Sequence, residues 1–241
     1  MVGTRRFLTV LSALSFLTIV GRSRAPSRHT FRWFAVVGAG IGAAVGGVHL
    51  GAHLLWPPLV AAAVVLAADL LLTGALHLDG LADTADGLGA QVDRARRLEL
   101  MAEPGIGAFA LAAGGSVLVA RWALLADGDI GLLEFVGVWA ASRVLAATVP
   151  AFVGYARPGG LAEAFCAGSR RWLLAWLAPV AAGLFFISGP LGPIAAGSAL
   201  VTCAGVAALA KRRLGGFTGD VLGAVIMLSE TAALLTLVAA P

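Results

Sequence analysis

The sequence predicts an all-α protein, a polytopic integral membrane bundle of about seven spanning helices with one further helix at the membrane interface near the N-terminus. The composition is the first reason, because 59% of the 241 residues are hydrophobic and only 12% are charged. Soluble domains carry about a quarter charged residues. The second reason is a mean hydropathy of +0.93. The third is the recurrence of apolar segments of about 20 residues, the length at which a helix crosses a bilayer.

The first apolar segment, residues 7–20, is short and has arginines on both sides. Its 14 residues are few for a spanning helix. A signal peptide would need a small-residue cleavage site where this chain has Gly-Arg-Ser-Arg. We therefore expect an uncleaved helix at the inner interface of the membrane, with a shallow spanning helix as the alternative.

Seven longer apolar segments follow, and each is expected to cross the membrane. They cover residues 33–55, 57–76, 105–126, 132–153, 172–189, 190–210 and 221–239. The connections after the second, fourth and sixth segments carry basic residues, and the other connections carry none. The positive-inside rule then predicts a multi-pass protein of the cell inner membrane, with the N-terminus and the three basic connections in the cytoplasm.

Charge and cysteine content narrow the partners. The net charge of +4 comes from clusters between apolar segments, which favour anionic lipid and phosphate-bearing ligands over nucleic acid. Cys166 and Cys203 form no CxxC motif and predict neither a disulfide framework nor a zinc site. The composition does not shift along the chain, so residues 1–241 are interpreted as a single membrane-embedded domain.

The most informative stretch gathers three carboxylates within a very apolar chain, at Asp79, Asp83 and Asp86. On a helix at about 100° per residue these side chains fall within roughly 60° of one another. Like charges at this spacing repel, and a divalent cation relieves the repulsion. Oxygen ligands without cysteine favour Mg²⁺. The stretch therefore predicts catalytic and metal-binding aspartates, with a solvated acidic helix end as the alternative.

Three other residues of this stretch support its functional interpretation. Gly80 and Gly87 lower its helix propensity, which indicates that some group approaches the backbone closely. His77 lies nearly opposite the aspartates on a helical wheel. We expect it to contact substrate or the membrane interface rather than a metal.

Two basic segments are candidates for binding the phosphates of a substrate. Arg94 and Arg97 lie on a polar amphipathic helix over residues 93–103, and arginine can clamp phosphate oxygens with its planar fork. A surface helix on anionic lipid is the alternative for them. The second segment is a glycine-rich loop whose predicted substrate-binding residues are Lys211, Arg212, Arg213, Gly215, Gly216, Thr218 and Asp220.

The loop pattern has a physical rationale. Glycines allow backbone N–H groups to turn toward an anion, and the N-terminus of the next helix adds a favourable dipole. Asp220 is expected to cap that helix. An ordinary topogenic loop with a turn is the alternative, but it explains only the cations.

Charged residues within the spans are candidates for pairing, because an unpaired charge is costly in lipid. We expect Asp69 to bridge to Arg143, and Arg121 and Glu134 to snorkel near the ends of their spans. Glu230 is a further carboxylate in the last span.

Taken together, these motifs resemble the cobalamin synthase family, also called adenosylcobinamide-GDP ribazoletransferase. The resemblance rests on residues 74–87, on the Arg-x-x-Glu-Leu-Met run that leads to Gly107, on Ser142-Arg143 and on residues 211–224. It covers nearly the whole chain. Glu103 and Met227 depart from the family pattern, where an aspartate and a glutamate are expected.

The resemblance implies a phosphotransferase of cobalamin biosynthesis. Its substrates would be adenosylcobinamide-GDP and α-ribazole or α-ribazole 5′-phosphate. The aspartates predict Mg²⁺ as the cofactor, and the positive-inside rule predicts a cytoplasmic active site. A homo-oligomer is compatible with this interpretation. A membrane CDP-alcohol phosphotransferase is an alternative, but its Asp-Gly-x-x-Ala-Arg spacing is missing, since Thr84 and Ala85 follow Asp83. A polytopic transporter is the other alternative.

Overall fold

The computed structural model describes residues 2–22, 27, 29–126, 129–157 and 168–239. Within these residues the chain forms helices and one isolated parallel bridge, between Tyr155 and Phe217. Six helices are long and apolar enough to cross a membrane, and a bent helix pair adds a seventh crossing if it counts as one span. The predicted all-α polytopic bundle is confirmed.

The elements have these bounds in chain order: α1 Val2–Leu17, η1 Thr30–Trp33, α2 Phe34–Leu55, α3 Pro58–Thr73, α4 Leu76–Gly89, α5 Arg94–Leu100, α6 Ala108–Ala126, α7 Leu132–Thr148, η2 Val149–Ala151, η3 Arg171–Trp176, α9 Leu177–Ser188, α10 Leu191–Leu214 and α11 Gly219–Val238.

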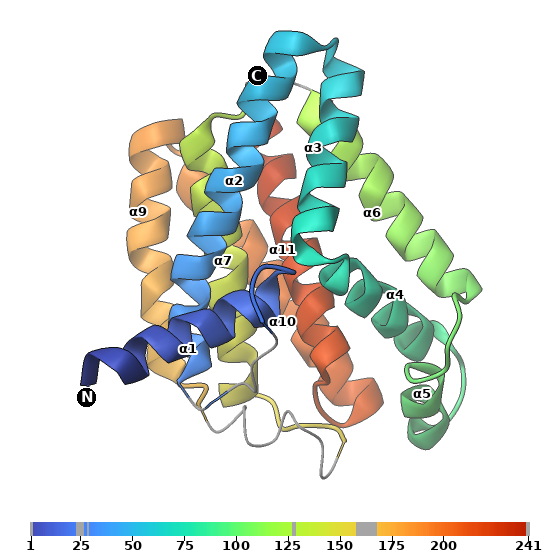
Figure 1. Cartoon of the computed structure of the whole chain (residues 1–241). Helices are drawn as coiled ribbons and strands as arrows, with labels where there is room; N and C mark the ends of the chain where they lie inside the picture. The colour runs from blue at the N-terminus through green and yellow to red at the C-terminus, as the bar shows by residue number, and fades with distance from the viewer. Residues whose placement is uncertain (1, 23–26, 28, 127–128, 158–167, 240–241) are drawn as a thin grey trace.

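The N-terminal helix α1 does not run parallel to the spanning helices. Figure 1 shows it inclined across α2, α7 and α9 at the end of the bundle that also holds α4 and α5. It docks on η1, where Trp33 Nε1 donates to Thr9 Oγ1 at 3.0 Å and the hydroxyls of Ser12 and Thr30 lie 3.2 Å apart. This placement agrees with the predicted interfacial helix and not with the spanning alternative.

Helices α2 and α7 pack closely because α2 carries glycines every four residues. A Cβ atom on Gly38 would lie 2.6 Å from the carbonyl oxygen of Trp139 on α7. Gly42 and Gly46 face the same helix, whereas Gly40 meets no atom within 4 Å. Small residues on one face allow two backbones to approach in a membrane, where no hydrophobic force drives helices together.

The second predicted span ends earlier than expected, and the acidic stretch forms a helix of its own. α3 stops at Thr73, and Gly74 and Ala75 both adopt the left-handed conformation, with φ of 61° and 54°. α4 then leaves at 87° to α3 (Figure 1). Glycine adopts this conformation without steric cost. The expectation of one helix over residues 57–76 is therefore corrected, because α4 turns away from the bundle axis.

The three basic connections meet at one end of the bundle. Arg94, after α4, donates from Nε to the carbonyl of Leu214 at 2.6 Å and from Nη2 to the carbonyl of Ala156 at 3.2 Å. These contacts join all three connections. Figure 1 places the N-terminus at the same end, and the C-terminus and the α2–α3 turn at the other. The predicted grouping of the basic connections is thus confirmed, while the side of the membrane stays a prediction.

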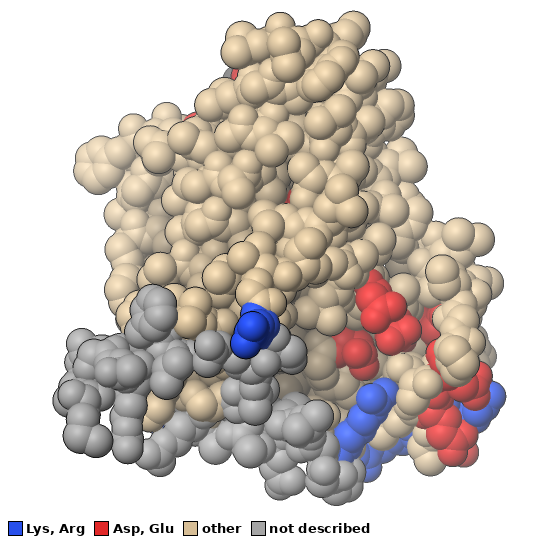
Figure 2. Space-filling view, in the orientation of Figure 1, with Lys and Arg blue, Asp and Glu red and all other residues tan. Residues whose placement is uncertain are grey.

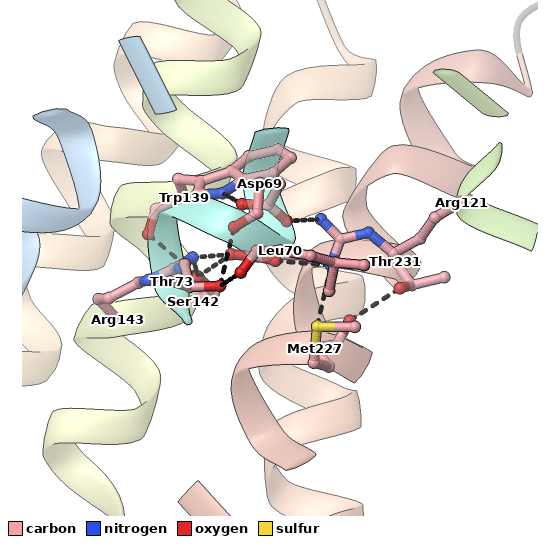
Figure 3. A network of polar contacts seen from close by, with 10 residues as sticks. Asp69, Leu70, Thr73, Arg121, Trp139, Ser142, Arg143, Met227 and Thr231 are labelled. Carbon is pink, nitrogen blue, oxygen red and sulfur yellow. Dashed lines mark hydrogen bonds and ion pairs between the residues drawn. The ribbon is translucent and has the colours of Figure 1, made fainter. Parts of the chain in front are cut away.

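A network of four charged side chains is buried inside the bundle (Figure 3). Arg121 of α6 donates to Asp69 of α3 and to Glu230 of α11, at 2.9 Å in each case. Arg143 of α7 pairs with Glu230, and Trp139 Nε1 donates to Asp69 at 3.1 Å. The ion pair predicted between Asp69 and Arg143 is therefore wrong, as is the snorkelling of Arg121, which is fully buried. Two acids and two arginines balance one another, the usual condition for buried charge.

Candidate functional site

The acidic helix α4 crosses α11 with backbone contact. A Cβ atom on Gly80 would lie 2.7 Å from the carbonyl oxygen of Asp220, and one on Gly223 would lie 3.2 Å from the Cα of Gly80. Gly87 is approached as closely, since a Cβ there would lie 2.6 Å from Met101 Sδ. The close approach predicted at both glycines is confirmed, and the approaching groups belong to the chain itself.

This crossing brings Asp79 and Asp83 of α4 beside Asp220, in the first turn of α11. We call these three carboxylates the acidic cluster. Asp79 is exposed, and Asp83 and Asp220 are half-buried. Burial, followed by the negative charges of Asp220 and Asp79, raises the pKa of the Asp83 carboxyl from 3.8 to about 6. The shift means that the three carboxylates lie within range of one another's charge. Figure 2 shows acidic side chains gathered beside basic ones at this end of the molecule.

Asp86, the third predicted aspartate, binds the backbone at the start of α6. Its Oδ2 accepts a hydrogen bond from the backbone N–H of Gly107 at 2.8 Å, and its Oδ1 accepts one from the N–H of Ala110 at 3.0 Å. These donors lie at the start of α6, where the first N–H groups of a helix have no partner within the helix. Asp86 therefore fixes α6 to α4, and its role as a metal ligand stays a prediction.

Three predicted phosphate-binding arginines hold helix ends together. Arg94 donates to the carbonyl of Leu214 at the end of α10. Arg97 donates to the carbonyl of Leu88 at 3.0 Å, near the end of α4, and Arg213 donates to the same carbonyl. Arginine near a helix C-terminus satisfies carbonyls that lack partners within the helix. Their phosphate contacts stay predictions, with these donors already used.

Lys211 and Arg212 differ from those arginines. Both are exposed near the end of α10. No hydrogen bond or ion pair joins either one to another residue in the described part of the chain. They are the two predicted substrate-binding cations that make no side-chain hydrogen bond or ion pair to the described residues.

The two adjacent glycines of the loop serve its packing. Gly215 has a φ of 74° and ends α10, and a Cβ on it would lie 2.8 Å from Arg94 Nε. A Cβ on Gly216 would lie 2.8 Å from the backbone nitrogen of Ala156. The glycines allow close approach, but the groups that approach are Arg94 and residues 154–156, and contact with an anion stays a prediction.

The cap of α11 is not the residue that we expected. Thr218 precedes the helix, and its Oγ1 accepts a hydrogen bond from the N–H of Val221 at 3.3 Å. Asp220 lies within the first turn, where its Oδ2 accepts from Thr218 Oγ1 at 3.1 Å. The prediction that Asp220 caps the helix is wrong, because the threonine occupies the cap position. The backbone of Asp220 lies against α4, where a Cβ on Gly80 would meet its carbonyl oxygen at 2.7 Å.

His77 is the second residue of α4 and lies on the face that packs against α11. A Cβ on Gly223 would lie 3.3 Å from the Cα of His77. The imidazole is buried, and its Nε2 has no hydrogen-bond partner among the described residues. The substrate contact predicted for His77 is not tested by this placement.

Arg157 was not among the predicted site residues. Its Nη2 lies 3.8 Å from Asp220 Oδ2, beside the acidic cluster. Arg157 belongs to the second basic connection, which interpretation of the sequence treated only as a topological signal. The available clue was that this connection shares the end of the bundle with the acidic stretch.

A cavity of about 430 Å³ lies beside the site between α4, α5 and α6. Its lining includes Asp86, Leu100, Glu103, Pro104, Ile106 and Phe109. The volume falls within the range of small-molecule sites.

The carboxylates of the acidic cluster could hold a hard cation only together with waters or substrate oxygens. Among the residues that the structure describes, no three His, Cys, Asp or Glu side chains are arranged as a metal cage. Mg²⁺ is usually held by one or two carboxylates together with waters and substrate phosphates. Asp79 and Asp83 lie one turn apart on α4, and the charges of Asp220 and Asp79 add to the effect of burial in raising the pKa of the Asp83 carboxyl. The donor chemistry of the acidic cluster suits that mode of binding.

Residues 8–238 match the family model described as cobalamin-5-phosphate synthase. The chain is 37% identical to the adenosylcobinamide-GDP ribazoletransferase of Pseudomonas aeruginosa, over 95% of this chain and 97% of the relative. It is 35% identical to that of Chlorobaculum tepidum, over 93% and 91%, and 38% identical to that of Bradyrhizobium diazoefficiens, over 92% and 90%. No solved structure matches it. With a match over nearly its whole length, the chain belongs to the cobalamin-5-phosphate synthase family.

Proposed function

We propose that this chain is an adenosylcobinamide-GDP ribazoletransferase. It joins adenosylcobinamide-GDP to α-ribazole or α-ribazole 5′-phosphate, and it forms adenosylcobalamin or adenosylcobalamin 5′-phosphate and GMP. The match to the family over residues 8–238 supports this reaction. The structural observation that carries it is the acidic cluster of Asp79, Asp83 and Asp220 where α4 crosses α11.

In the reaction, the ribazole replaces GMP on the phosphorus that bears cobinamide. A ribose hydroxyl of the ribazole attacks the phosphorus that bears cobinamide, the bond from that phosphorus to the GMP oxygen breaks, and GMP leaves with the bonding electrons. The hydroxyl proton passes to a carboxylate of the acidic cluster. A carboxyl whose pKa is raised toward neutrality is suited to such a transfer, and the pKa of Asp83 is raised to about 6.

We propose Mg²⁺ as the cofactor, held by the carboxylates of Asp79 and Asp83 on one face of α4. Bound there, the cation would supply positive charge to the pyrophosphate oxygens of the substrate. Asp86 contributes by holding the start of α6 against α4. The free donors of Lys211 and Arg212 are suited to the guanosine diphosphate portion, while Arg94, Arg97 and Arg213 shape the loops from which those cations project.

The site is proposed to face the cytoplasm at the inner membrane. All three basic connections lie at the end of the bundle that holds the acidic cluster, and basic residues concentrate on the cytoplasmic side of membrane proteins. Soluble substrates would then reach α4, which turns away from the bundle axis at 87°.

The reaction is tested with purified protein in detergent or a bilayer, supplied with adenosylcobinamide-GDP, α-ribazole 5′-phosphate and Mg²⁺. GMP and adenosylcobalamin 5′-phosphate should appear in equal amounts, and a chelator should stop both. Release of GMP without the cobamide would indicate hydrolysis, and a response to a CDP-alcohol would indicate lipid phosphotransfer. Absence of the cobamide with both substrates and metal present would contradict the proposal. If a chelator leaves synthesis unchanged, the proposed Mg²⁺ is contradicted and the proposed reaction is not.

A further inference from the structure

Arg157 is held beside the acidic cluster by its own backbone. The N–H of Ala156 donates to the carbonyl of Phe217 at 2.8 Å, and the N–H of Phe217 donates to the carbonyl of Gly154 at 2.9 Å. These bonds form the parallel bridge between Tyr155 and Phe217, and the two rings pack edge to face with centroids 5.4 Å apart. The segment before Arg157 is thereby fixed to the loop that leads into α11.

Two further contacts make this placement rigid. Arg94 Nη2 donates to the carbonyl of Ala156 at 3.2 Å. Gly216 leaves no room for a side chain, because a Cβ there would lie 3.0 Å from the carbonyl carbon of Tyr155. Close backbone contact of this kind explains the second glycine of the loop. The glycine loop therefore positions Arg157.

The Arg157 side chain is placed to bind an anion. Its Nη2 donates to the carbonyl of Leu98 at 3.3 Å and lies 3.8 Å from Asp220 Oδ2. Its side chain is 35% exposed. Its Nη1 and Nε make no hydrogen bond to the residues that the structure describes. Part of the Arg157 fork therefore remains available to an anion.

A purely structural ion pair does not account for this arrangement. The contact with Asp220 is long, uses a nitrogen that is shared with a carbonyl, and lies near solvent, where ion pairs contribute about 0 to 1 kcal/mol. The charge of Arg157 acts on two carboxylates, those of Asp220 and Asp83, so one guanidinium cannot neutralise the cluster. It can contact an anion that a cation at those carboxylates also binds.

We propose that Arg157 binds a phosphate of the guanosine diphosphate portion of the substrate, next to Asp79, Asp83 and Asp220. The inference rests on the proposed function, because it takes the nucleotide from that reaction. An arginine offers a phosphate two parallel N–H donors, which a lysine cannot reproduce. Arg157 is thus a substrate-contacting residue rather than part of a topological signal.

The test measures binding of GDP to the purified, detergent-solubilised protein by calorimetry, in the presence of Mg²⁺ and with no second substrate. Arg157→Gln should weaken the GDP affinity tenfold or more, and Arg157→Lys should weaken it by a smaller factor. Arg171→Gln is the matched control, because Arg171 is an exposed arginine at the same end whose guanidinium lies 5.2 Å from the Phe152 ring. Its GDP affinity should equal that of the wild type.

Turnover provides the second measurement. In Arg157→Lys the KM for adenosylcobinamide-GDP should rise while the KM for α-ribazole 5′-phosphate stays unchanged. Wild-type affinity for GDP in both Arg157 variants would overturn the inference and leave the proposed reaction standing. A different result is that the wild-type protein forms no cobamide while the Arg157 variants still lose GDP binding. That result would contradict the proposed reaction and support the phosphate site.

Discussion

Arg121 of α6 donates a hydrogen bond to the carboxylate of Asp69 on α3 at 2.9 Å, and both side chains are buried inside the bundle. The same guanidinium also reaches Glu230 of α11. One arginine therefore ties three helices together, and Asp69 lies four residues before the end of α3. The bend that starts α4 follows directly, so this ion pair supports the position of the acidic helix.

Removing Arg121 should destabilise the bundle strongly. Arg121→Gln leaves the charge of Asp69 buried without its partner, which costs about 3 to 5 kcal/mol. Asp69→Asn combined with Arg121→Gln removes one charge of each sign and should recover part of that loss. Thermal unfolding in detergent measures both effects. Glu134→Gln, at a half-buried carboxylate in the first turn of α7, is the control and should change little. Equal losses in the single and double variants would contradict the pairing.

The aspartates of α4 and α11 should separate into two groups. Asp79→Asn, Asp83→Asn and Asp220→Asn each remove a carboxylate of the acidic cluster and should lower turnover on the order of a hundredfold or more. Their stability should hold or rise, because like charges are relieved. Asp86→Asn should instead lower the unfolding temperature, because its oxygens cap α6, at a cost of about 1 kcal/mol. A uniform loss of stability in all four variants would show the cluster to be structural.

The metal-free protein should lose stability as the pH rises through 6. The pKa of Asp83 is raised in the folded protein from 3.8 to about 6, so the folded state binds the proton more tightly than the unfolded chain does. The contribution is complete below about pH 4 and is lost as the pH passes 6. Mg²⁺ binds the charged form and should oppose this loss. Unfolding temperatures between pH 4.5 and 7.5, with chelator or Mg²⁺, measure the effect. Asp83→Asn should remove this group's part of the pH dependence.

The crossing of α4 and α11 should not tolerate a methyl group. Gly80→Ala would place a Cβ 2.7 Å from the Asp220 carbonyl oxygen, and the backbone must then move. Overpacking of this kind costs about 1 to 3 kcal/mol, and separation of the helices should reduce turnover more than tenfold. Gly115→Ala on α6 is the matched control, since a Cβ there meets nothing within 4 Å. It should gain up to about 1 kcal/mol from helix propensity. Turnover unchanged in Gly80→Ala would place the reacting groups elsewhere.

Membrane orientation is tested with single cysteines in a background without Cys166 and Cys203. Val92→Cys, on an exposed residue between α4 and α5, should react with an impermeant thiol reagent only in inverted vesicles. Trp56→Cys, in the α2–α3 turn at the opposite end, should react only in intact cells. The reverse pattern would place the acidic cluster outside. The native Cys166 lies outside the described residues and Cys203 is buried, so neither provides this test.

The spans were predictable because hydrophobic length is a local property, and the apolar segments of the sequence became helices with nearly the expected bounds. The bend at Gly74 and Ala75 was not predictable in the same way. Gly74 is compatible with a helix end, but a left-handed alanine carries no local signal, and nothing in the sequence indicates the angle at which α4 leaves. The predicted partner of Asp69 was also wrong. Asp69 pairs with Arg121, and Arg143 pairs with Glu230. These partners depend on how the helices pack, which spacing along the chain does not encode.

Prediction of the site was also limited to residues that lie close together in the sequence. Asp79 and Asp83 were found because one helical face displays them together. Asp220 was found as part of a loop motif, but its approach to Asp83 depends on the glycine contact between α4 and α11. Arg157 was missed because only a backbone bridge to Phe217 brings it to the cluster. Residues that meet through long-range contacts leave no spacing pattern for a single sequence to reveal.

The buried ion pairs also impose an order on how the protein is made. Asp69 enters the membrane with α3 and Arg121 with α6, whereas Glu230 arrives with α11, which the ribosome makes later. Until then Arg121 and Arg143 exceed the single carboxylate of Asp69, and an uncompensated charge in lipid costs a few kcal/mol. A nascent chain that still lacks α11 therefore carries one buried positive charge without a partner, and the bundle is complete only when Glu230 is in place.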